Sequence, residues 1–279
     1  MKGKKARFNM MLTVIFSVIS VIFVSPVFIV LMNSFKKKAY INKEPFKLAM
    51  GKTFVGLENY VNGIEKTNFI EAFGYSLFIT VCSVAVIILC TSMCAWYITR
   101  VKNKLTETMY YLFVFSMIVP FQMVMFTLSK IANMLRLSNP VGIILVYLGF
   151  GAGLAVFMFC GFVKSIPLEI EEAAMIDGCT PIQTYFQVVI PILKPTCITV
   201  AILQAMWIWN DYLLPYLVLD LKKYKTIPIA VQYLRGGYGS IDMGAMMAML
   251  VLAIIPIIIF YLSCQKYIIE GVVAGAVKG

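Results

Sequence analysis

The sequence predicts an all-α integral membrane protein with six transmembrane helices. Of its 279 residues, 61% are hydrophobic and only 13% are charged. Soluble domains are about 45 to 50% apolar and about 25% charged, so this chain has too little polar surface to cover a water-soluble globule of its length. Because lipid offers no hydrogen bonds to the backbone, each apolar run that crosses the bilayer must be a helix.

The apolar residues gather in stretches long enough to span a bilayer, which takes about 20 residues in a helix. The first stretch follows several basic residues, as in a signal peptide, but it is longer than the about 7 to 15 apolar residues of such a peptide, so we expect it to remain as an anchor. An even number of spans returns both termini to one side, and residues 1–279 are expected to form a single transmembrane domain. The six predicted spans are residues 10–32, 73–98, 109–129, 141–163, 196–219 and 243–265.

The charge pattern excludes one class of partner and leaves the orientation open. The formal net charge is +11, but a nucleic-acid surface needs its basic residues on one soluble face. Here they flank the apolar runs, which is typical of charges that hold helix ends at lipid headgroups, so we expect a lipid partner and no nucleic acid. Lys and Arg are divided almost equally between the two sets of loops, so the positive-inside rule favours neither orientation.

The residue inventory argues against an enzyme. The chain has no histidine, which removes Ser-His-Asp and Cys-His arrangements and histidine metal sites. Its seven cysteines contain no Cys-x-x-Cys pair and lie mostly in apolar runs, so neither a metal site nor a disulfide is predicted. Gly51-Lys52-Thr53 resembles the end of a phosphate-binding loop, but Phe46 stands where the first glycine is required. We therefore expect no catalytic residue and no cofactor in this chain.

The polar loop at residues 164–195 has the start and stop signals of two short helices. Pro167 suits a first turn, and Glu169, Glu171 and Glu172 place negative charge at a helix N-terminus, where the dipole favours it. Gly178 fits a C-terminal stop. Thr180, Pro181 and Gln183 then form a helix start with a capping box, and Pro191 and Pro195 are expected to end the second helix.

The second short helix has an apolar face, formed by Ile182, Tyr185 or Phe186, and Val189 at helical spacing. A loop in water does not expose such a face without a partner. Two interpretations stay open at this point: the face packs on the chain's own helices, or it docks another subunit.

The same loop resembles the signature loop of the permease subunits of binding-protein-dependent ABC importers. The residues that carry the resemblance are Glu172-Ala173-Ala174, Asp177-Gly178, and Val188-x-Ile190-Pro191 after nine further residues. Val188, Ile190 and Cys179 are mild departures from the commonest residues. Four further segments resemble the sugar-importing, maltose-type branch of that family: residues 54–60, Trp209-Asn210 with Pro215, residues 225–228, and the tail at 274–279.

The resemblance implies an ABC importer permease architecture in the bacterial cytoplasmic membrane, with the signature loop and both termini in the cytoplasm. It implies that this chain forms half of a translocation path for a sugar, and the branch points to an oligosaccharide. The implied partners are a second related permease, two ATPase subunits that bind ATP and Mg²⁺, and an extracytoplasmic solute-binding protein. The implied ATPase contact involves Glu172, Ala173, Ala174, Asp177, Gly178, Tyr185, Phe186 and Pro191.

Polar side chains inside spanning helices are costly and often functional, so they are the candidates for the sugar path. They are Gln122 in the third predicted span and Gln204, Asn210 and Asp211 in the fifth. Hydrogen bonds between neighbouring helices explain each of them equally well. Two alternative functions stay open: an ABC permease for another solute, and a secondary transporter, although the latter would more often keep ionisable residues deep in its helices.

Overall fold

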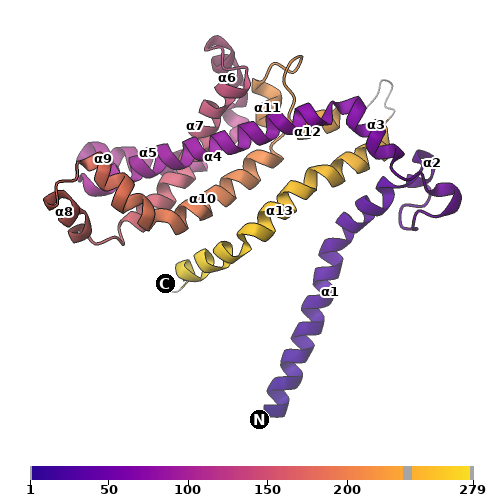
Figure 1. Cartoon of the computed structure of the whole chain (residues 1–279), viewed down its shortest axis with the longest axis horizontal. Coiled ribbons are helices and arrows are strands. Elements are labelled where there is room, and N and C mark those ends of the chain that lie inside the picture. Colours follow the sequence, from indigo (N-terminus) through magenta and orange to yellow (C-terminus); the bar gives the residue numbers. More distant parts are fainter. Residues whose placement is uncertain (1, 235–240, 277–279) are drawn as a thin grey trace. The chain divides into compact units, whose positions relative to one another are not determined.

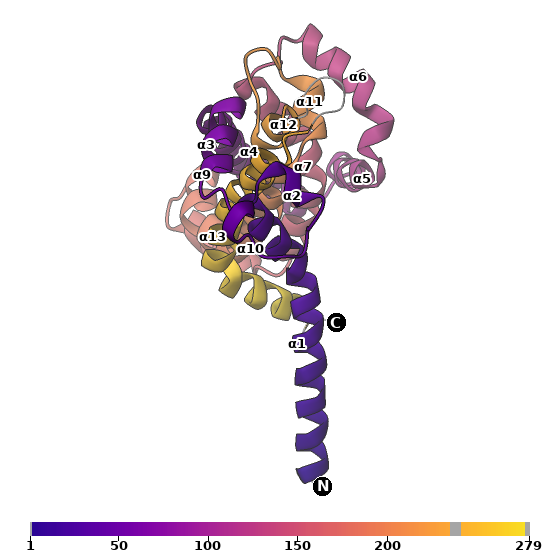
Figure 2. The same cartoon turned by 90° about the vertical axis from the view of Figure 1, so that its right-hand side faces the viewer.

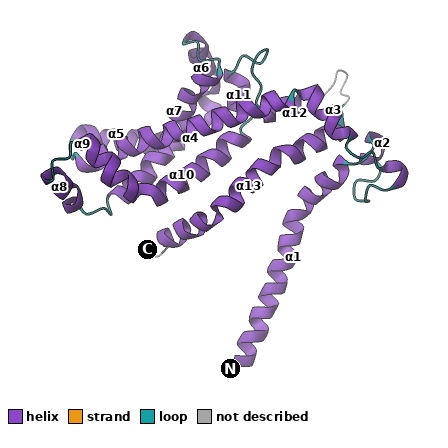
Figure 3. Ribbon diagram, in the orientation of Figure 1, coloured by secondary structure: helices purple, strands orange, loops and turns teal. Residues whose placement is uncertain are grey.

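The computed structural model describes residues 2–234 and 241–276, and these residues are almost entirely helical (Figures 1 and 3). Lys36 and Phe54 form an isolated antiparallel β-bridge. The predicted all-α class is therefore confirmed. The elements are α1 (Lys2–Ser34), α2 (Lys38–Ile41), the 3-10 helix η1 (Gly51–Thr53), α3 (Glu58–Thr67), α4 (Phe69–Arg100), α5 (Lys104–Ile118), α6 (Phe121–Met134), α7 (Pro140–Val163), α8 (Leu168–Ile176), α9 (Pro181–Thr184), the π-helix η2 (Tyr185–Val189), α10 (Ile190–Asn210), α11 (Leu213–Val218), α12 (Ile227–Gln232) and α13 (Met243–Ala276).

The described residues form two compact units. The first holds residues up to 70 together with 230–256, and the second holds 71–229 together with the residues from 257 onward. Within residues 2–234 and 241–276, five helices are long and apolar enough to cross a membrane, and the bent pair α5 and α6 makes a sixth candidate if it is counted as one span. The number of spans thus agrees with the sequence prediction, but the third of the six differs in form from the predicted straight helix and the fifth differs in its bounds.

The third predicted span, at residues 109–129, is not one straight helix. It is broken at Val119 and Pro120, and α5 and α6 meet at 107° (Figure 2). Pro120 has no N–H to donate, and its ring forces the preceding residue out of the helical region. Val119 accordingly has an extended ψ of 115°. The prediction of a continuous helix was wrong because it rested on the length of the apolar run, and this one proline breaks the helix within that run.

The fifth predicted span, at residues 196–219, begins earlier and ends earlier than expected. The helix runs without a stop from Pro181 to Asn210, so the prediction that Pro191 and Pro195 end it was wrong. The π-helix just before Pro191 bonds the Ile190 N–H to the Tyr185 carbonyl, and this wider turn accommodates a residue that has no N–H of its own. A proline that follows such a turn is tolerated inside a helix.

In the first unit, the segment at residues 54–60 closes the end of α1. The Asn59 amide donates to the carbonyls of Ser34 and Lys36, at 2.8 and 2.9 Å, and the Tyr60 hydroxyl lies 2.7 Å from Ser34 Oγ. The Phe35 ring packs on the Tyr60 ring at 5.3 Å between centroids. Residues 54–60, one of the segments that resemble the sugar-importing branch, therefore satisfy the Ser34 carbonyl at the end of α1 and the Lys36 carbonyl just beyond it.

The core of the second unit lies where α7 meets α5, α10 and α4. Glycine allows the close approaches between these helices, but not at every glycine position of α7. A Cβ atom on Gly153 would lie 2.8 Å from the Phe113 carbonyl oxygen of α5, and one on Gly151 would lie 2.7 Å from Ile87 Cδ1 of α4. A Cβ atom on Gly149 would have no neighbour within 4 Å. The tight contacts are therefore at Gly151 and Gly153.

We expect Gly153→Ala to lower the thermal stability of the purified chain, while Gly149→Ala leaves it unchanged or slightly raises it. Both substitutions gain about 1 kcal/mol of helix propensity. Only Gly153→Ala forces α5 away from α7, at an overpacking cost of about 1 to 3 kcal/mol. Loss of helical circular dichroism on heating in detergent measures the difference. Equal melting temperatures for the two variants would contradict the close approach of α5 and α7.

Candidate functional site

The turn after α8 is built around Gly178. Its φ is +90°, a conformation that side chains with a Cβ atom rarely adopt. The Gly178 N–H donates to the Met175 carbonyl at 3.1 Å, and the Cys179 N–H donates to the Ala174 carbonyl at 3.0 Å. This pair of bonds is the Schellman arrangement that ends a helix by satisfying its last carbonyls. The predicted stop at Gly178 is confirmed.

The start of α9 also agrees with the sequence. The Thr180 hydroxyl accepts from the Gln183 N–H, and the Gln183 side chain accepts from the Thr180 N–H, which makes the predicted capping box. Pro181 occupies the first helical position. In α8, Pro167 is the residue just before the helix rather than in its first turn. The two helices are thus joined by a short turn that is hydrogen-bonded on both sides.

The π-helix separates the apolar residues of the second short helix into two sets. Tyr185 and Val189 are fully buried in the core of the second unit, whereas Ile182 and Phe186 are exposed. Both interpretations left open by the sequence therefore apply, each to different residues. Tyr185 and Val189 pack on the chain's own helices, and Ile182 and Phe186 present an apolar surface.

α8 also exposes apolar side chains. Ile176, at the end of α8, has 86% of its area exposed. Most residues of the signature pattern are exposed too: these are Glu172, Ala173, Asp177, Gly178 and Pro191, whereas Ala174 is half-buried. Several exposed apolar side chains in one short segment are typical of a contact surface. We call it the loop surface, and its apolar members are Leu168, Ile170, Met175, Ile176, Ile182 and Phe186.

The opposite side of α8 is fixed to α4 by a buried ion pair. The Arg100 guanidinium donates to Glu171 Oε1 from Nη2 at 2.6 Å and from Nε at 3.0 Å, and the Trp96 indole N–H donates to Glu171 Oε2 at 2.9 Å. Arg100 Nη2 also donates to the Ile166 carbonyl at 3.0 Å. The Glu171 side chain is 3% exposed and that of Arg100 is 20% exposed. Both carboxylate oxygens are thus satisfied out of water.

A third contact lies one turn further along α4. The Tyr185 hydroxyl is 2.7 Å from Ser92 Oγ, and the Tyr185 ring packs on the Trp96 ring at 5.6 Å between centroids. Ser92, Trp96 and Arg100 recur every four residues, so they share one face of α4. Together with Glu171 and Tyr185 they form what we call the α4 clamp. Figure 1 shows α8 and α9 at the end of the second unit where α4 finishes.

Sequence reasoning missed most of the clamp. It treated Glu171 as one of three carboxylates near a helix N-terminus and assigned no role to Ser92, Trp96 or Arg100. The available signal was their spacing of four residues at the end of an apolar helix, followed by a carboxylate in the next loop. A fully buried Glu is rare without a partner, and the sequence does not show which of the three glutamates has one. The structure is what distinguishes Glu171 from its exposed neighbours.

Two of the four path candidates have structural roles. The Gln204 amide is 3% exposed and donates to the Gly151 carbonyl of α7 at 3.2 Å. Asp211 accepts from the Tyr147 hydroxyl at 3.1 Å and from the N–H groups of Leu213 and Leu214 at the start of α11. These contacts link helices and start a new one, and the break at Asp211 explains why the predicted span ends early.

The other two candidates are exposed. Gln122 lies in the first turn of α6, just after the bend, and Asn210 lies at the end of α10, where its amide donates to the Met206 carbonyl at 2.7 Å. The neighbouring Trp209 is buried, with its ring edge against the Phe73 ring. The Trp209-Asn210 pair therefore divides into one core residue and one surface residue.

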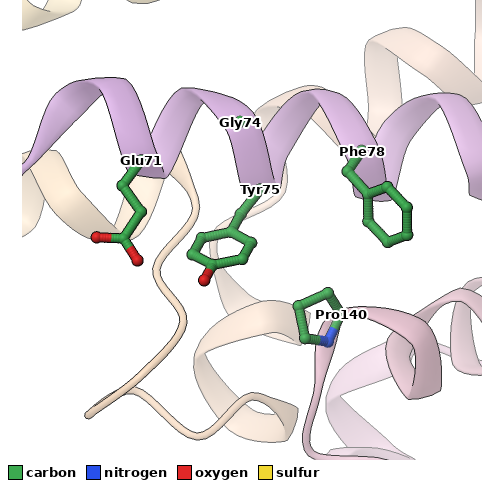
Figure 4. A pocket seen from close by; sticks show the side chains of 5 residues that line it. All are labelled: Glu71, Gly74, Tyr75, Phe78 and Pro140. Atoms are coloured by element: carbon green, nitrogen blue, oxygen red, sulfur yellow. The ribbon is translucent and has the colours of Figure 1, made fainter.

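A hollow of about 410 Å³ lies at the beginning of α4, far along this helix from Arg100. The rings of Tyr75 and Phe78 point toward the side where α7 begins (Figure 4), and the Tyr75 ring also meets the edge of Tyr224 at 5.4 Å. The wall is mainly apolar and includes one carboxylate. Its lining residues are Glu71, Gly74, Tyr75, Phe78 and Pro140.

The comparisons with known proteins agree over almost the whole chain. Residues 87–273 match the family described as "Binding-protein-dependent transport system inner membrane component". The chain is 39% identical to a probable starch degradation products transport system permease protein, AmyC, of Thermoanaerobacterium thermosulfurigenes, with 96% of both chains covered. It is 34% identical to the multiple sugar-binding transport system permease protein MsmG of Streptococcus mutans, with 95% of both covered. In fold it resembles a chain of a bacterial ABC transporter involved in the import of the acidic polysaccharide alginate, with a TM-score of 0.80 at 20% identity, covering 95% of this chain and 97% of that one.

Proposed function

Because this chain belongs to the family of inner-membrane components of binding-protein-dependent transport systems, we propose that it forms half of the translocation path of an oligosaccharide importer. The multi-pass helices and the family establish a membrane transport component rather than an enzyme. The sugar class is supported by the relatives, which are named as permeases for starch degradation products and for multiple sugars. We infer that the other half of the path is a second, related permease in a bacterial cytoplasmic membrane.

The observation that carries the coupling role is the loop surface beside the hydrogen-bonded turn at Gly178. An exposed Ile176 and Phe186 need a partner in water, and the closed turn holds both short helices in a fixed geometry. We propose that an ATPase subunit covers this surface and that the loop is therefore cytoplasmic. ATP and Mg²⁺ belong to that ATPase in this proposal, since this chain has an incomplete phosphate-loop sequence at Gly51-Lys52-Thr53.

In the proposed cycle, the closure of two ATPase subunits on ATP displaces α8 and α9. The attached helices then move as bodies between states that open to opposite sides of the membrane, which is the bistable behaviour expected of alternating access. A solute-binding protein delivers the sugar at the side away from the loop surface. The binding energy of ATP thus selects one of two arrangements of the same helices.

For the sugar contacts, Asn210 and Gln122 are the better candidates of the four, because both are exposed. Gln204 and Asp211 instead support the helices around them. The hollow at the start of α4 adds a second candidate region, since Tyr75 and Phe78 offer apolar ring faces and Glu71 offers an acceptor for sugar hydroxyls. Alanine variants that insert normally but change the affinity for sugar would identify the contacts.

The function is tested by reconstituting this chain in proteoliposomes with the second permease, ATPase and solute-binding protein of the same cell. We expect radiolabelled maltotriose to enter only when ATP and the binding protein are both present, and ATP hydrolysis to increase when the binding protein carries sugar. Uptake that follows an ion gradient without ATP would indicate a secondary transporter. ATP-driven uptake of an amino acid or phosphate but of no sugar would indicate a permease for another solute.

A further inference from the structure

We propose that the α4 clamp makes the coupling loop and α4 move as one body, and that Glu171 is the positioning residue on which this depends. The inference rests on the proposed function, because it concerns how ATPase motion reaches the spanning helices. It assigns a role to Glu171, Arg100, Trp96 and Ser92, whose side chains face inward and are not part of the loop surface.

The clamp is suited to transmit force because its contacts are both buried and spread along the helix. Ser92 and Arg100 are eight residues apart, about 12 Å along α4 at 1.5 Å per residue. Contacts at both ends of such a length resist sliding and rotation of the loop relative to α4. A single contact would leave α8 free to pivot about it.

The ion pair fixes the orientation of the Glu171 carboxylate as well as its distance from α4. Arg100 reaches Glu171 Oε1 with two nitrogen atoms and also holds the Ile166 carbonyl in the connection that enters α8, while Trp96 holds Oε2. A planar guanidinium makes such a set of bonds and an ammonium does not. The carboxylate of Glu171 therefore has one position relative to α4, whereas the neighbouring Glu172 is exposed.

The other contacts of the loop explain what loss of the clamp would do. α8 also packs on α9 and on the π-helix, and α9 continues into α10. Without Glu171, the loop would keep its shape and its attachment to α10. Its attachment to α4 would lose the buried carboxylate and keep the Tyr185 contacts with Ser92 and Trp96 and the Arg100 bond to the Ile166 carbonyl. We therefore expect an uncoupled transporter, in which ATP is still hydrolysed but α4 no longer follows the loop.

The test compares Glu171→Gln with the matched control Glu169→Gln, an exposed carboxylate on the same helix. Each variant is reconstituted in the full complex, and maltotriose uptake and ATP hydrolysis are measured together. We expect Glu171→Gln to assemble, to keep binding-protein-stimulated hydrolysis, and to use about tenfold more ATP per sugar imported, within the about 5- to 150-fold range typical of coupling between sites. Glu169→Gln should match the wild type.

Three further measurements distinguish a loss of coupling from a failure of the Glu171→Gln variant to fold or assemble. Should Glu171→Gln not assemble, Trp96→Phe removes the indole N–H donor to Glu171 and keeps an aromatic ring beside Tyr185. We expect about a threefold to tenfold rise in ATP used per sugar, since one hydrogen bond to the carboxylate is lost. The double variant Arg100→Gln with Glu171→Gln should be no worse than the worse single variant, because both remove one interaction. Spin labels at Met93 on α4 and at position 169 on α8 should keep one separation through the nucleotide cycle in the wild type and show a changing separation in Glu171→Gln.

The results separate this inference from the proposed function. If the wild-type complex imports no sugar with ATP, the proposed function fails. If the wild type is coupled and Glu171→Gln uses the same amount of ATP per sugar, the clamp does not transmit motion and the inference is overturned. It is also overturned if hydrolysis and uptake fall in equal proportion in each variant, or if the effects of Arg100→Gln and Glu171→Gln simply add.

Discussion

Gly178→Val is expected to abolish sugar transport while the chain still inserts into the membrane and accumulates normally. At φ +90° a valine is strained whatever the space around it, and Gly178 has open space: a Cβ atom there meets nothing within 4 Å. The cost is therefore a change of backbone, of about 1 to 3 kcal/mol for a residue held in such a region. The turn is expected to relax by losing the bonds to Met175 and Ala174, which changes the angle between α8 and α9.

A graded series at this position tests that reasoning. Asparagine tolerates positive φ better than other side chains, so Gly178→Asn should retain more transport than Gly178→Ala, and Gly178→Val should retain least. Uptake of maltotriose by the reconstituted complex and the amount of inserted protein are measured for each variant. Normal uptake by Gly178→Val, or the same loss for all three variants, would contradict a role for the backbone conformation.

Ile176→Glu is expected to weaken ATPase binding by about 2 to 4 kcal/mol, the size found for the main anchor residues of interfaces. This corresponds to roughly 30- to 700-fold in the dissociation constant. The reason is that a carboxylate would be placed at the most exposed apolar position of the loop surface and would lose its water on docking. Copurification of the ATPase with the tagged permease complex in detergent measures the loss.

The control at the same position is Ile176→Met, which keeps an apolar side chain of similar size and should retain the ATPase. Ile182→Glu, on the other short helix, is expected to have an effect in the same direction, because Ile182 belongs to the same surface. Full retention of the ATPase by both glutamate variants would show that the loop surface is covered by something else.

The fold class and the loop could be predicted because the signals there are local. Apolar runs of spanning length predict helices, and the caps at Gly178 and Thr180 depend on a few neighbouring residues whose conformations follow from sequence. The effects of the prolines were harder to predict, because they depend on the conformation of the neighbouring residues. Pro120 breaks a helix, whereas Pro191 and Pro195 lie within one, and the π-helix that accounts for the second case left no signal that was read from the sequence.

The site could be predicted only where its residues are neighbours in the chain. The loop surface follows from residues 168–186, but the α4 clamp joins Ser92, Trp96 and Arg100 to partners more than 70 residues away. Hydropathy treats Glu171 and Glu172 alike, yet one is buried and the other exposed. The polar residues of the spans were ambiguous for the same reason: Gln204 and Asn210 differ in what surrounds them. The tail at residues 274–279, which supported the sugar branch, lies partly outside the described residues, and its side chains lie wholly outside them.

The continuity of α9, the π-helix and α10 has a mechanical consequence. A helix of the 30 residues from Pro181 to Asn210 is about 45 Å long at 1.5 Å per residue. If the end at α9 is held by an ATPase and the helix tilts by about 10°, its other end moves by about 8 Å, more than the width of a glucose ring, on this helix geometry. Asn210 lies at that far end. A small rotation of the helix at the loop is thus enlarged along its length, so in the proposed cycle the end at Asn210 moves further than the end at α9.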